Sequence, residues 1–176
     1  AGPDEDVHSF VERQLVERIG DAGRRLHTGR SRNEQVSLDL RLYLRRRIGL
    51  LQRAVVRLVG ACADQAEQAG AAMMPSYTHL RRAQPVLVAH FFLSHASALR
   101  RDHGRLAVAA QEADSLTLGS GAIAGTSYGI DTDLLARTLG FSRVVANSMD
   151  ASSDRDFVAS FLYAISLGMV HLSRIA

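Results

Sequence analysis

One stretch decides the fold: NEQVSLDLRLYLRRRIGLLQRAVVRLVGACADQAEQ, which runs from Asn33 to Gln68. It contains no Pro, and its apolar residues recur every three or four positions, which is typical of an amphipathic helix. The expected buried stripe comprises Val36, Leu40, Tyr43, Leu44, Ile48, Leu51, Val55, Leu58, Val59 and Cys62. A helix of about 36 residues spans about 54 Å, which is longer than most single domains need. The stretch therefore predicts a helical bundle or a coiled-coil-like assembly.

Further helical patterns flank this stretch, and polar segments separate them. Val7 to Ile19 has helical spacing, with Asp4 or Asp6 able to cap its start and Gly20 able to end it. A polar, glycine-bearing loop is expected from Asp21 to Arg32.

The middle of the sequence predicts a break and then a second long helix. The polar segment Pro75 to Gln84 interrupts helicity, and Pro85 suits the first turn of a helix that runs to about Asp114. Thr117 to Gly129 is rich in Gly and Ser and is expected to be a loop.

Two more helices are expected near the end of the sequence. Asp131 can cap a short helix that Gly140 ends, and a polar turn from Asn147 to Ser153 leads into a helix from about Asp154. This last helix is still apolar at Ala176, so we expect the natural protein to continue. No stretch shows sustained two-residue alternation. The expected fold class is therefore all-α, with no sheet of consequence.

The composition limits the class of protein. A chain of 176 residues that is 47% hydrophobic can form one globular domain. No uninterrupted apolar run reaches the roughly 18 residues of a membrane helix, so we expect no membrane partner. Cys62 is the single cysteine, which excludes an internal disulfide and a thiolate metal cluster. This fits a reducing cytoplasm. No other metal-ligand spacing is present, so we expect no metal.

The net charge is +3, and every basic side chain is Arg, because the sequence contains no Lys. Six of these arginines gather in the long helical stretch: Arg41, Arg45, Arg46, Arg47, Arg53 and Arg57. One interpretation is an anionic partner such as nucleic acid. The other is a solvated helix face or a helix–helix contact, and it is favoured because few aromatic residues interleave with these arginines. We therefore expect no nucleic-acid partner.

A polar run, HTGRSRNEQ from His27 to Gln35, lies at the start of the long helix. Free backbone N–H groups at a helix start favour an anion. Arg30 and Arg32 can grip carboxylates in a fork, and Ser31 and Asn33 can donate further hydrogen bonds. The alternative is an N-cap with surface arginines, and physical reasoning alone does not choose between them.

A second polar run, SYTHLRRAQP, extends from Ser76 to Pro85. His79 can transfer or stabilise a proton near neutral pH, and Thr78 can donate to a carboxylate. A lone loop histidine is more often structural, but the polar neighbours of this one favour a site. The helical histidines are expected to be packing or surface residues: His90, His95 and His171.

A third run, GSGAIAGT from Gly119 to Thr126, is rich in glycine. Such loops can cradle phosphate. This one lacks the Gly-Lys-Ser/Thr ending of a nucleotide P-loop, so a tight connection that packs against neighbouring helices is favoured.

Together these runs resemble the argininosuccinate lyases, a family of the aspartase/fumarase superfamily. HTGRSRN at 27–33 is similar to the family's first signature, and YTHL followed by AQP within 77–85 is similar to its second. LGSGA at 118–122, NSMD at 147–150 and DRDF at 154–157 are similar to later family stretches. The five matches occur in family order and cover nearly the whole chain.

The resemblance implies an all-α long-helix bundle of the aspartase/fumarase type. It implies a cytoplasmic homotetramer with active sites at chain interfaces. It also implies a carbon–nitrogen lyase of arginine biosynthesis that needs no cofactor. The substrate would be argininosuccinate, cleaved reversibly to arginine and fumarate by β-elimination.

The resemblance also implies roles for individual residues. Four of them match positions that bind the substrate's carboxylates or lie beside them: Ser31, Arg32, Asn33 and Thr78. His79 matches the catalytic histidine, whose role as base or charge stabiliser stays open. Two departures flank it, since Arg81 stands where glutamine is usual and Ser76 where glycine is usual. Both changes affect the local geometry expected around His79.

The expected organisation is a single helical region, 1–176. Within it, 1–32 forms a short helix and substrate-binding loop, and 33–176 forms a long-helix bundle domain that is incomplete at its C-terminal end. The family's third signature, a serine-bearing loop followed by a lysine, is absent, so the 176 residues alone are expected to be inactive. The alternatives are a non-catalytic structural relative, as some lens crystallins are, and another fumarate-releasing lyase.

Overall fold

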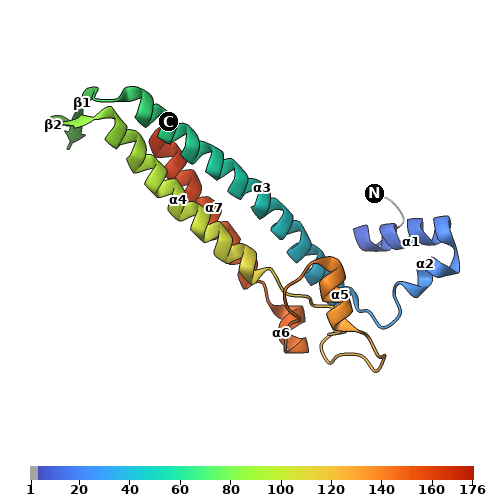
Figure 1. Ribbon diagram of the computed structural model, residues 1–176. Helices are drawn as coiled ribbons and strands as arrows, with labels where there is room; N and C mark the ends of the chain where they lie inside the picture. The colour runs from blue at the N-terminus through green and yellow to red at the C-terminus, as the bar shows by residue number, and fades with distance from the viewer. Residues whose placement is uncertain (1–3) are drawn as a thin grey trace. The chain divides into compact units, whose positions relative to one another are not determined.

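A computed structural model describes residues 4–176 and is predominantly helical (Figure 1). The elements in chain order are α1 (Val7–Ile19), α2 (Asp21–Arg25), α3 (Arg32–Ala69), β1 (Met73–Thr78), β2 (Arg81–Leu87), α4 (Val88–Glu112), α5 (Thr132–Leu139), α6 (Ser148–Ser153) and α7 (Asp156–Ile175). The expected all-α fold class is confirmed.

The chain forms two compact units. Unit 1 contains the described part of Ala1–Leu40 together with Ser115–Asp154, and unit 2 contains Arg41–Asp114 together with Arg155–Ala176. Helix α3 begins in unit 1 and continues through unit 2.

The predicted helix boundaries at α1 and α5 are confirmed, and their caps explain them. The Asp6 carboxylate accepts a hydrogen bond from the Ser9 backbone N–H at the start of α1, where one donor would otherwise be unpaired. Asp131 accepts from Leu134 N–H in the same way at α5. Gly140 ends α5 at φ 72°, in the left-handed region that glycine enters without steric cost.

The predicted long helix is also confirmed, because α3 runs over 38 residues. Its predicted buried stripe is only partly right. Ile48 and Cys62 are buried, whereas Tyr43 is 55% exposed. Within unit 2, Cys62 packs with Ala96 and Leu99 of α4. The long helix is therefore covered along part of its apolar surface only.

The expectation at Pro85 is wrong. This residue lies in β2 opposite Pro75 of β1, in an antiparallel hairpin, and α4 begins three residues later at Val88. A two-stranded ribbon has two edges, so each strand accepts a proline without losing a central hydrogen bond. Most of the hairpin's side chains are exposed on both faces, which is why the sequence carries no alternating pattern there.

Two short helices occupy segments that were expected to be a loop and a turn. Helix α2 lies within the expected loop from Asp21 to Arg32, and α6 replaces the turn expected from Asn147. The Asn147 side chain accepts from the backbone N–H groups of Met149 and Asp150, which supplies an N-cap for α6.

In unit 2, α4 and α7 lie side by side along their length (Figure 1). A buried polar cluster joins them. Asp102 of α4 is 2% exposed, and its carboxylate contacts His171 Nδ1 of α7 at 2.6 Å and Arg105 at 3.0 Å. A buried carboxylate is stable only when partners of this kind satisfy it.

Helix α7 is long and apolar enough to cross a membrane, judged by length and composition alone. Only 6% of that stretch is buried within this chain. The same test is passed by helices whose apolar surface another part of a protein covers, so the indication is weak.

In unit 1 the segment before the glycine-rich loop is pinned by backbone hydrogen bonds. Leu116, which is fully buried, donates to the Arg143 carbonyl at 2.8 Å and accepts from Val145 N–H at 2.9 Å. This bridge and the buried Thr117 next to it fix where the glycine-rich loop begins.

Candidate functional site

The first predicted site run forms the capped start of α3. The Ser31 hydroxyl oxygen accepts from Asn33 N–H at 3.3 Å, and the Ser31 N–H donates to Glu34 Oε1 at 2.9 Å. This reciprocal arrangement satisfies donors that the helix leaves unpaired. The N-cap interpretation therefore holds for Ser31, whether or not its hydroxyl also serves a ligand.

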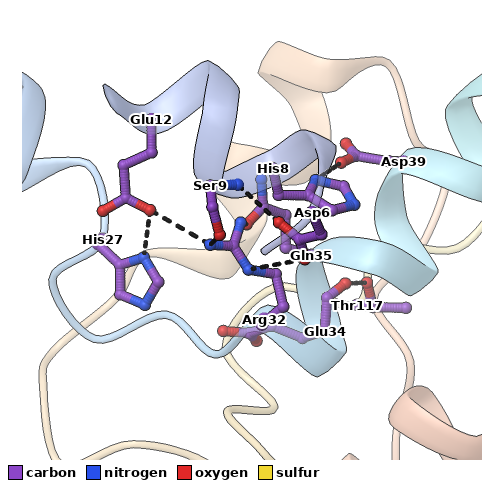
Figure 2. A network of polar contacts seen from close by, with 10 residues as sticks. All are labelled: Asp6, His8, Ser9, Glu12, His27, Arg32, Glu34, Gln35, Asp39 and Thr117. Carbon is purple, nitrogen blue, oxygen red and sulfur yellow. Dashed lines mark hydrogen bonds and ion pairs between the residues drawn. The ribbon is translucent and has the colours of Figure 1, made fainter. Parts of the chain in front are cut away.

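Arg32 is held by polar groups of α1 and of its own helix (Figure 2). Its guanidinium donates to Glu12 Oε2 and to Ser9 Oγ, both at 3.4 Å, and to Gln35 Oε1 at 3.2 Å. The Asp6 carboxylate lies 3.9 Å away. These contacts orient the guanidinium, and they mean that an added carboxylate has to compete with Glu12.

Two histidines border this network (Figure 2). His27 Nδ1 lies 3.2 Å from Glu12 Oε2, so Glu12 serves both His27 and Arg32. His8 Nδ1 lies 3.3 Å from Asp39 Oδ2 of α3. Helix α1 is thus tied to the start of α3 by several charged side chains.

Two acidic side chains of this region, Asp4 and Asp6, have lowered pKa values. The Ser9 backbone N–H holds the pKa of Asp6 below its ordinary value, and the positive charge of Arg32 acts in the same direction. The Arg13 guanidinium lowers the pKa of Asp4 through a 2.8 Å contact. Both carboxylates therefore stay negative at neutral pH.

Asn33 differs from its two neighbours. Its side chain is exposed and makes no hydrogen bond within the described part of the chain. The amide therefore keeps both its donors and its acceptor free for a ligand.

Glu34 is a residue of this region that sequence reasoning did not single out. It is fully buried, and its Oε2 accepts from Gly121 N–H at 2.9 Å while its backbone carbonyl accepts from Thr117 Oγ1 at 3.0 Å. Together with the Ser31 contact, Glu34 joins the start of α3 to the glycine-rich loop. The only sequence signal was the Ser-x-x-Glu spacing from Ser31.

The glycine-rich loop is buried at Ser120 and Gly121 and exposed from Ala122 to Ala124. Gly121 has φ 59°, and a Cβ there would lie 2.4 Å from the Gly125 carbonyl oxygen. A side chain at this position is incompatible with the fold of the loop. The loop's main role in this structure is to pack against Glu34.

The second predicted site run forms the β1–β2 hairpin of unit 2. Thr78 pairs with Arg81, and the two residues between them, His79 and Leu80, have φ of 51° and 60°. Positive φ at both positions defines a type I′ turn, which normally selects Asn-Gly. Backbone strain at non-glycine residues is often found at functional positions.

The tip of the hairpin is open to solvent. Thr78 and His79 are exposed, and Leu80 is 99% exposed. Ser76 of β1 lies opposite a bulge in β2, where Ala83 and Gln84 face this single residue, and its hydroxyl donates to the Gln84 carbonyl at 2.6 Å. This bond replaces ladder pairing at the bulge and fixes the register of the strand that leads to His79.

The structure thus brings the predicted residues together in two groups. Ser31, Arg32 and Asn33 are consecutive at the start of α3 in unit 1, and Thr78 and His79 are consecutive in the hairpin of unit 2. That the two groups share one pocket stays a prediction.

Two of the helical histidines contact neighbouring side chains. His95 packs edge-on against Phe91 at 4.7 Å between ring centres, and His171 pairs with the buried Asp102. Among residues 4–176, no group of three or more His, Cys, Asp or Glu is placed to hold a metal ion.

Comparison with known proteins places this geometry in context. The sequence profile of the lyase family matches residues 2–176. The argininosuccinate lyase of Caldanaerobacter subterraneus subsp. tengcongensis is 50% identical over 171 residues, which are 97% of this chain and 39% of that protein. The argininosuccinate lyase of Synechococcus sp. (strain CC9605) is 52% identical over 98% of this chain and 37% of its own length. The chain thus spans less than two fifths of these relatives.

Solved structures show the same fold. EDDS lyase in complex with formate superposes with a TM-score of 0.88 at 27% identity, over 94% of this chain and 33% of that one. A variant of EDDS lyase with bound fumarate gives the same values. Because the family profile matches essentially the whole sequence, this chain belongs to the lyase family.

Proposed function

We propose that this chain is the central portion of an argininosuccinate lyase. The observation that carries the proposal is the 50% identity to a curated argininosuccinate lyase over 97% of this chain. Both predicted site runs lie within that span. The reaction would be the reversible cleavage of argininosuccinate to arginine and fumarate.

The chemistry is a β-elimination. A base removes a proton from the carbon beside a carboxylate of the succinyl part, and the electron pair forms the double bond of fumarate. The carbon–nitrogen bond breaks, and the guanidine takes up a proton to leave as arginine. Proton removal places extra negative charge on the carboxylate, so fixed donors aimed at that group lower the barrier most.

The start of α3 supplies donors suited to this task. Asn33 has an exposed amide that makes no hydrogen bond within the described part of the chain, and it lies in the first turn of α3. Arg32 adds a positive charge that α1 already orients through Glu12. We assign Ser31, Arg32 and Asn33 to the binding of substrate carboxylate groups.

The hairpin supplies the group that takes part in removing the succinyl proton or that stabilises the negative charge developing on the carboxylate. We assign His79 as the catalytic histidine and Thr78 as a donor to a substrate carboxylate. Support comes from the left-handed backbone at His79, which holds the imidazole on the exposed tip of a turn whose register Ser76 fixes. A ligand held there would meet His79 and Thr78 together.

The protein is proposed to be a cytoplasmic homotetramer with its active sites at chain interfaces. Support comes from large apolar side chains that unit 2 leaves exposed on α7, including Tyr163, Met169 and Val170 at 61%, 64% and 53%. Monomeric proteins seldom expose a contiguous apolar face of this kind. Association of like subunits would cover it.

The test is an absorbance assay for fumarate release from argininosuccinate by the purified full-length protein. We expect turnover without added metal or cofactor. A correctly folded full-length protein that is silent with argininosuccinate would contradict the proposal and favour a structural, crystallin-like role.

A second candidate is a lyase that releases fumarate from another amine-substituted succinate. The likeness to EDDS lyase, at 27% identity with a TM-score of 0.88, favours it over unrelated functions. Turnover of EDDS in the same assay, with argininosuccinate inert, would establish this alternative.

A further inference from the structure

The arginine cluster of α3 is a feature that the proposed lyase function does not use. Within unit 2 the structure separates its members by what they contact. Arg41 donates to the Glu112 carbonyl and stacks over Phe157, Arg45 pairs with Asp114 at 3.1 Å, and Arg47 stacks over Tyr43. These three arginines are explained by contacts within the chain. A fourth, Arg46, is exposed and lines a different depression, which the acidic Asp114 also lines.

Arg53 and Arg57 have no such explanation. Neither makes an ion pair, a hydrogen bond or a ring contact within the described part of the chain, and both are exposed. They stand four residues apart on α3, so their guanidinium groups share one face of the helix. Like charges at this spacing destabilise a helix when no anion compensates them.

The two arginines line a shallow, open hollow on the surface of α3, and His103 of α4 borders it; the lining residues are Gly49, Gln52, Arg53, Val56, Arg57 and His103. No acidic residue lines it. A Cβ at Gly49 would lie 3.8 Å from Arg53 Nη1, so the Arg53 guanidinium reaches toward the helix surface that this glycine leaves bare. The hollow thus has two positive charges, an imidazole and an amide around open space.

We propose that this hollow binds a small multivalent oxyanion. Two guanidinium groups on one helix face can each offer a pair of parallel N–H donors to phosphate or carboxylate oxygens. Gln52 adds an amide donor, and His103 adds a ring N–H from α4. The ligand class is a compact anion of charge two or more that carries phosphate or carboxylate groups.

The site is separate from the proposed lyase site in the residues it uses. It contains none of the residues assigned to argininosuccinate, and its walls come from the middle of α3 and α4. The inference therefore stands or falls independently of the lyase reaction.

The experiment is isothermal titration calorimetry of the full-length protein at low ionic strength, with inorganic pyrophosphate and citrate as the two probes. We expect at least one probe to bind, and the double variant Arg53→Gln/Arg57→Gln to weaken that binding at least tenfold. A preference for pyrophosphate or for citrate identifies the natural ligand as a phosphate or a carboxylate compound. The single variant Arg57→Gln should show an intermediate loss.

The matched control is Arg18→Gln/Arg137→Gln, which removes the same charge from two exposed positions in unit 1. It should bind both probes as the unmodified protein does. The proposal is overturned if neither probe binds, if both double variants lose affinity equally, or if fumarate displaces the probe, which would assign the binding to the lyase site. Dissociation of the oligomer in Arg53→Gln/Arg57→Gln would also overturn it, because the hollow would then be a subunit contact.

Discussion

At the scale of single residues, two neighbours at the start of α3 have different roles: Glu34 stabilises the fold, and Asn33 is available to a ligand. Glu34 is fully buried and accepts from two backbone N–H groups, those of Ser31 and Gly121. A carboxylate satisfied in this way stabilises the surrounding backbone instead of facing a substrate. Asn33, one residue earlier, is exposed and unpaired within the described chain. Glu34 thus supports the backbone of the site, whereas the adjacent Asn33 can contact a ligand.

The first prediction concerns Asn33. In the full-length protein, Asn33→Ala should lower kcat/KM for argininosuccinate about 100- to 1000-fold, because loss of one donor to developing negative charge costs about 2.7–4 kcal/mol in a comparable case. Steady-state fumarate release measures it. Gln68→Ala, an exposed amide on the same helix, is the control and should leave kcat/KM unchanged. An unchanged kcat/KM in Asn33→Ala would remove Asn33 from the site.

The second prediction concerns the glycine-rich loop. Gly121→Ala should destabilise unit 1 by about 1–3 kcal/mol, because the residue needs a positive φ and its Cβ would collide with the Gly125 carbonyl. Gly129→Ala is the matched control, since a Cβ there meets nothing within 4 Å. Urea denaturation of the full-length protein measures both. Equal stability of the two variants would mean that the loop adapts and that the Glu34–Gly121 contact is dispensable.

At the scale of elements, sequence periodicity and capping residues were sufficient for α1, α3 and α5. Asp6 and Asp131 each cap a helix by accepting from a backbone N–H three residues later, and this chemistry is local enough to infer from spacing. The β1–β2 hairpin could not be inferred, because its strands are largely exposed and carry no alternation. Its turn uses His79 and Leu80 where glycine is usual, so turn chemistry gave no signal either.

The same limits apply to the candidate site. Ser31, Arg32 and Asn33 were singled out because their donors gather at one helix start, and the family resemblance supplied the roles predicted for them. Glu34 was missed because its partner Gly121 lies 87 residues further along the chain, and only the fold brings them together. Long-range contacts of this kind leave no periodic trace in a single sequence.

The third prediction tests strain in the hairpin. Leu80→Gly should stabilise the hairpin by about 1 kcal/mol, because glycine adopts a positive φ without the steric cost that Leu80 bears at φ 60°. Leu87→Gly is the control in the same hairpin, where φ is −69° and glycine only adds backbone entropy to the unfolded state, so stability should fall. Hydrogen–deuterium exchange of residues 73–87 in the full-length protein measures both. Faster exchange in Leu80→Gly than in the unmodified protein would contradict the strain argument.

The fourth prediction concerns the acid sensitivity of α1. The folded-state pKa of Asp6 is lowered, chiefly by the hydrogen bond from Ser9 N–H. The cap's contribution to the stability of α1 is therefore fully present above the unfolded carboxyl pKa of about 3.9. This contribution is lost as the pH falls through the lower pKa that Asp6 has in the folded state. Asp6→Asn keeps a capping oxygen without a titrating group. We compare the hydrogen-exchange rates of α1 in the unmodified protein and in Asp6→Asn. The ratio of these rates should change as the pH falls below the unfolded carboxyl pKa and stay constant above it. A ratio independent of pH throughout would contradict the assigned cap.

At the scale of the whole molecule, unit 2 leaves part of its apolar surface uncovered. Unit 2 buries Ile48 and Leu99 but leaves a 410 Å³ apolar groove along α3, α4 and α7, lined by Leu58, Leu106 and Phe161 among others. The apolar character of α7 that meets the composition test for a membrane span also suits a helix at a subunit contact. Membership of the lyase family and the proposed active sites between chains favour the subunit contact.

The last prediction tests this assembly. The full-length protein should be a homotetramer by light scattering at micromolar concentration, and Val170→Glu should shift it to smaller species. Val170 is 53% exposed on α7 and lies one helical heptad from Tyr163, so a charge there would be buried without a partner in the assembly. Leu134→Glu is the control, because it introduces the same charge at a similarly exposed position (52%) on α5 in unit 1 and should leave the mass unchanged. Circular dichroism of Val170→Glu separates dissociation from unfolding, since the helices should persist in the smaller species. A folded, active monomer of the unmodified protein would show that the exposed face of α7 is covered by the protein's own chain, and that no second subunit is needed to complete the site.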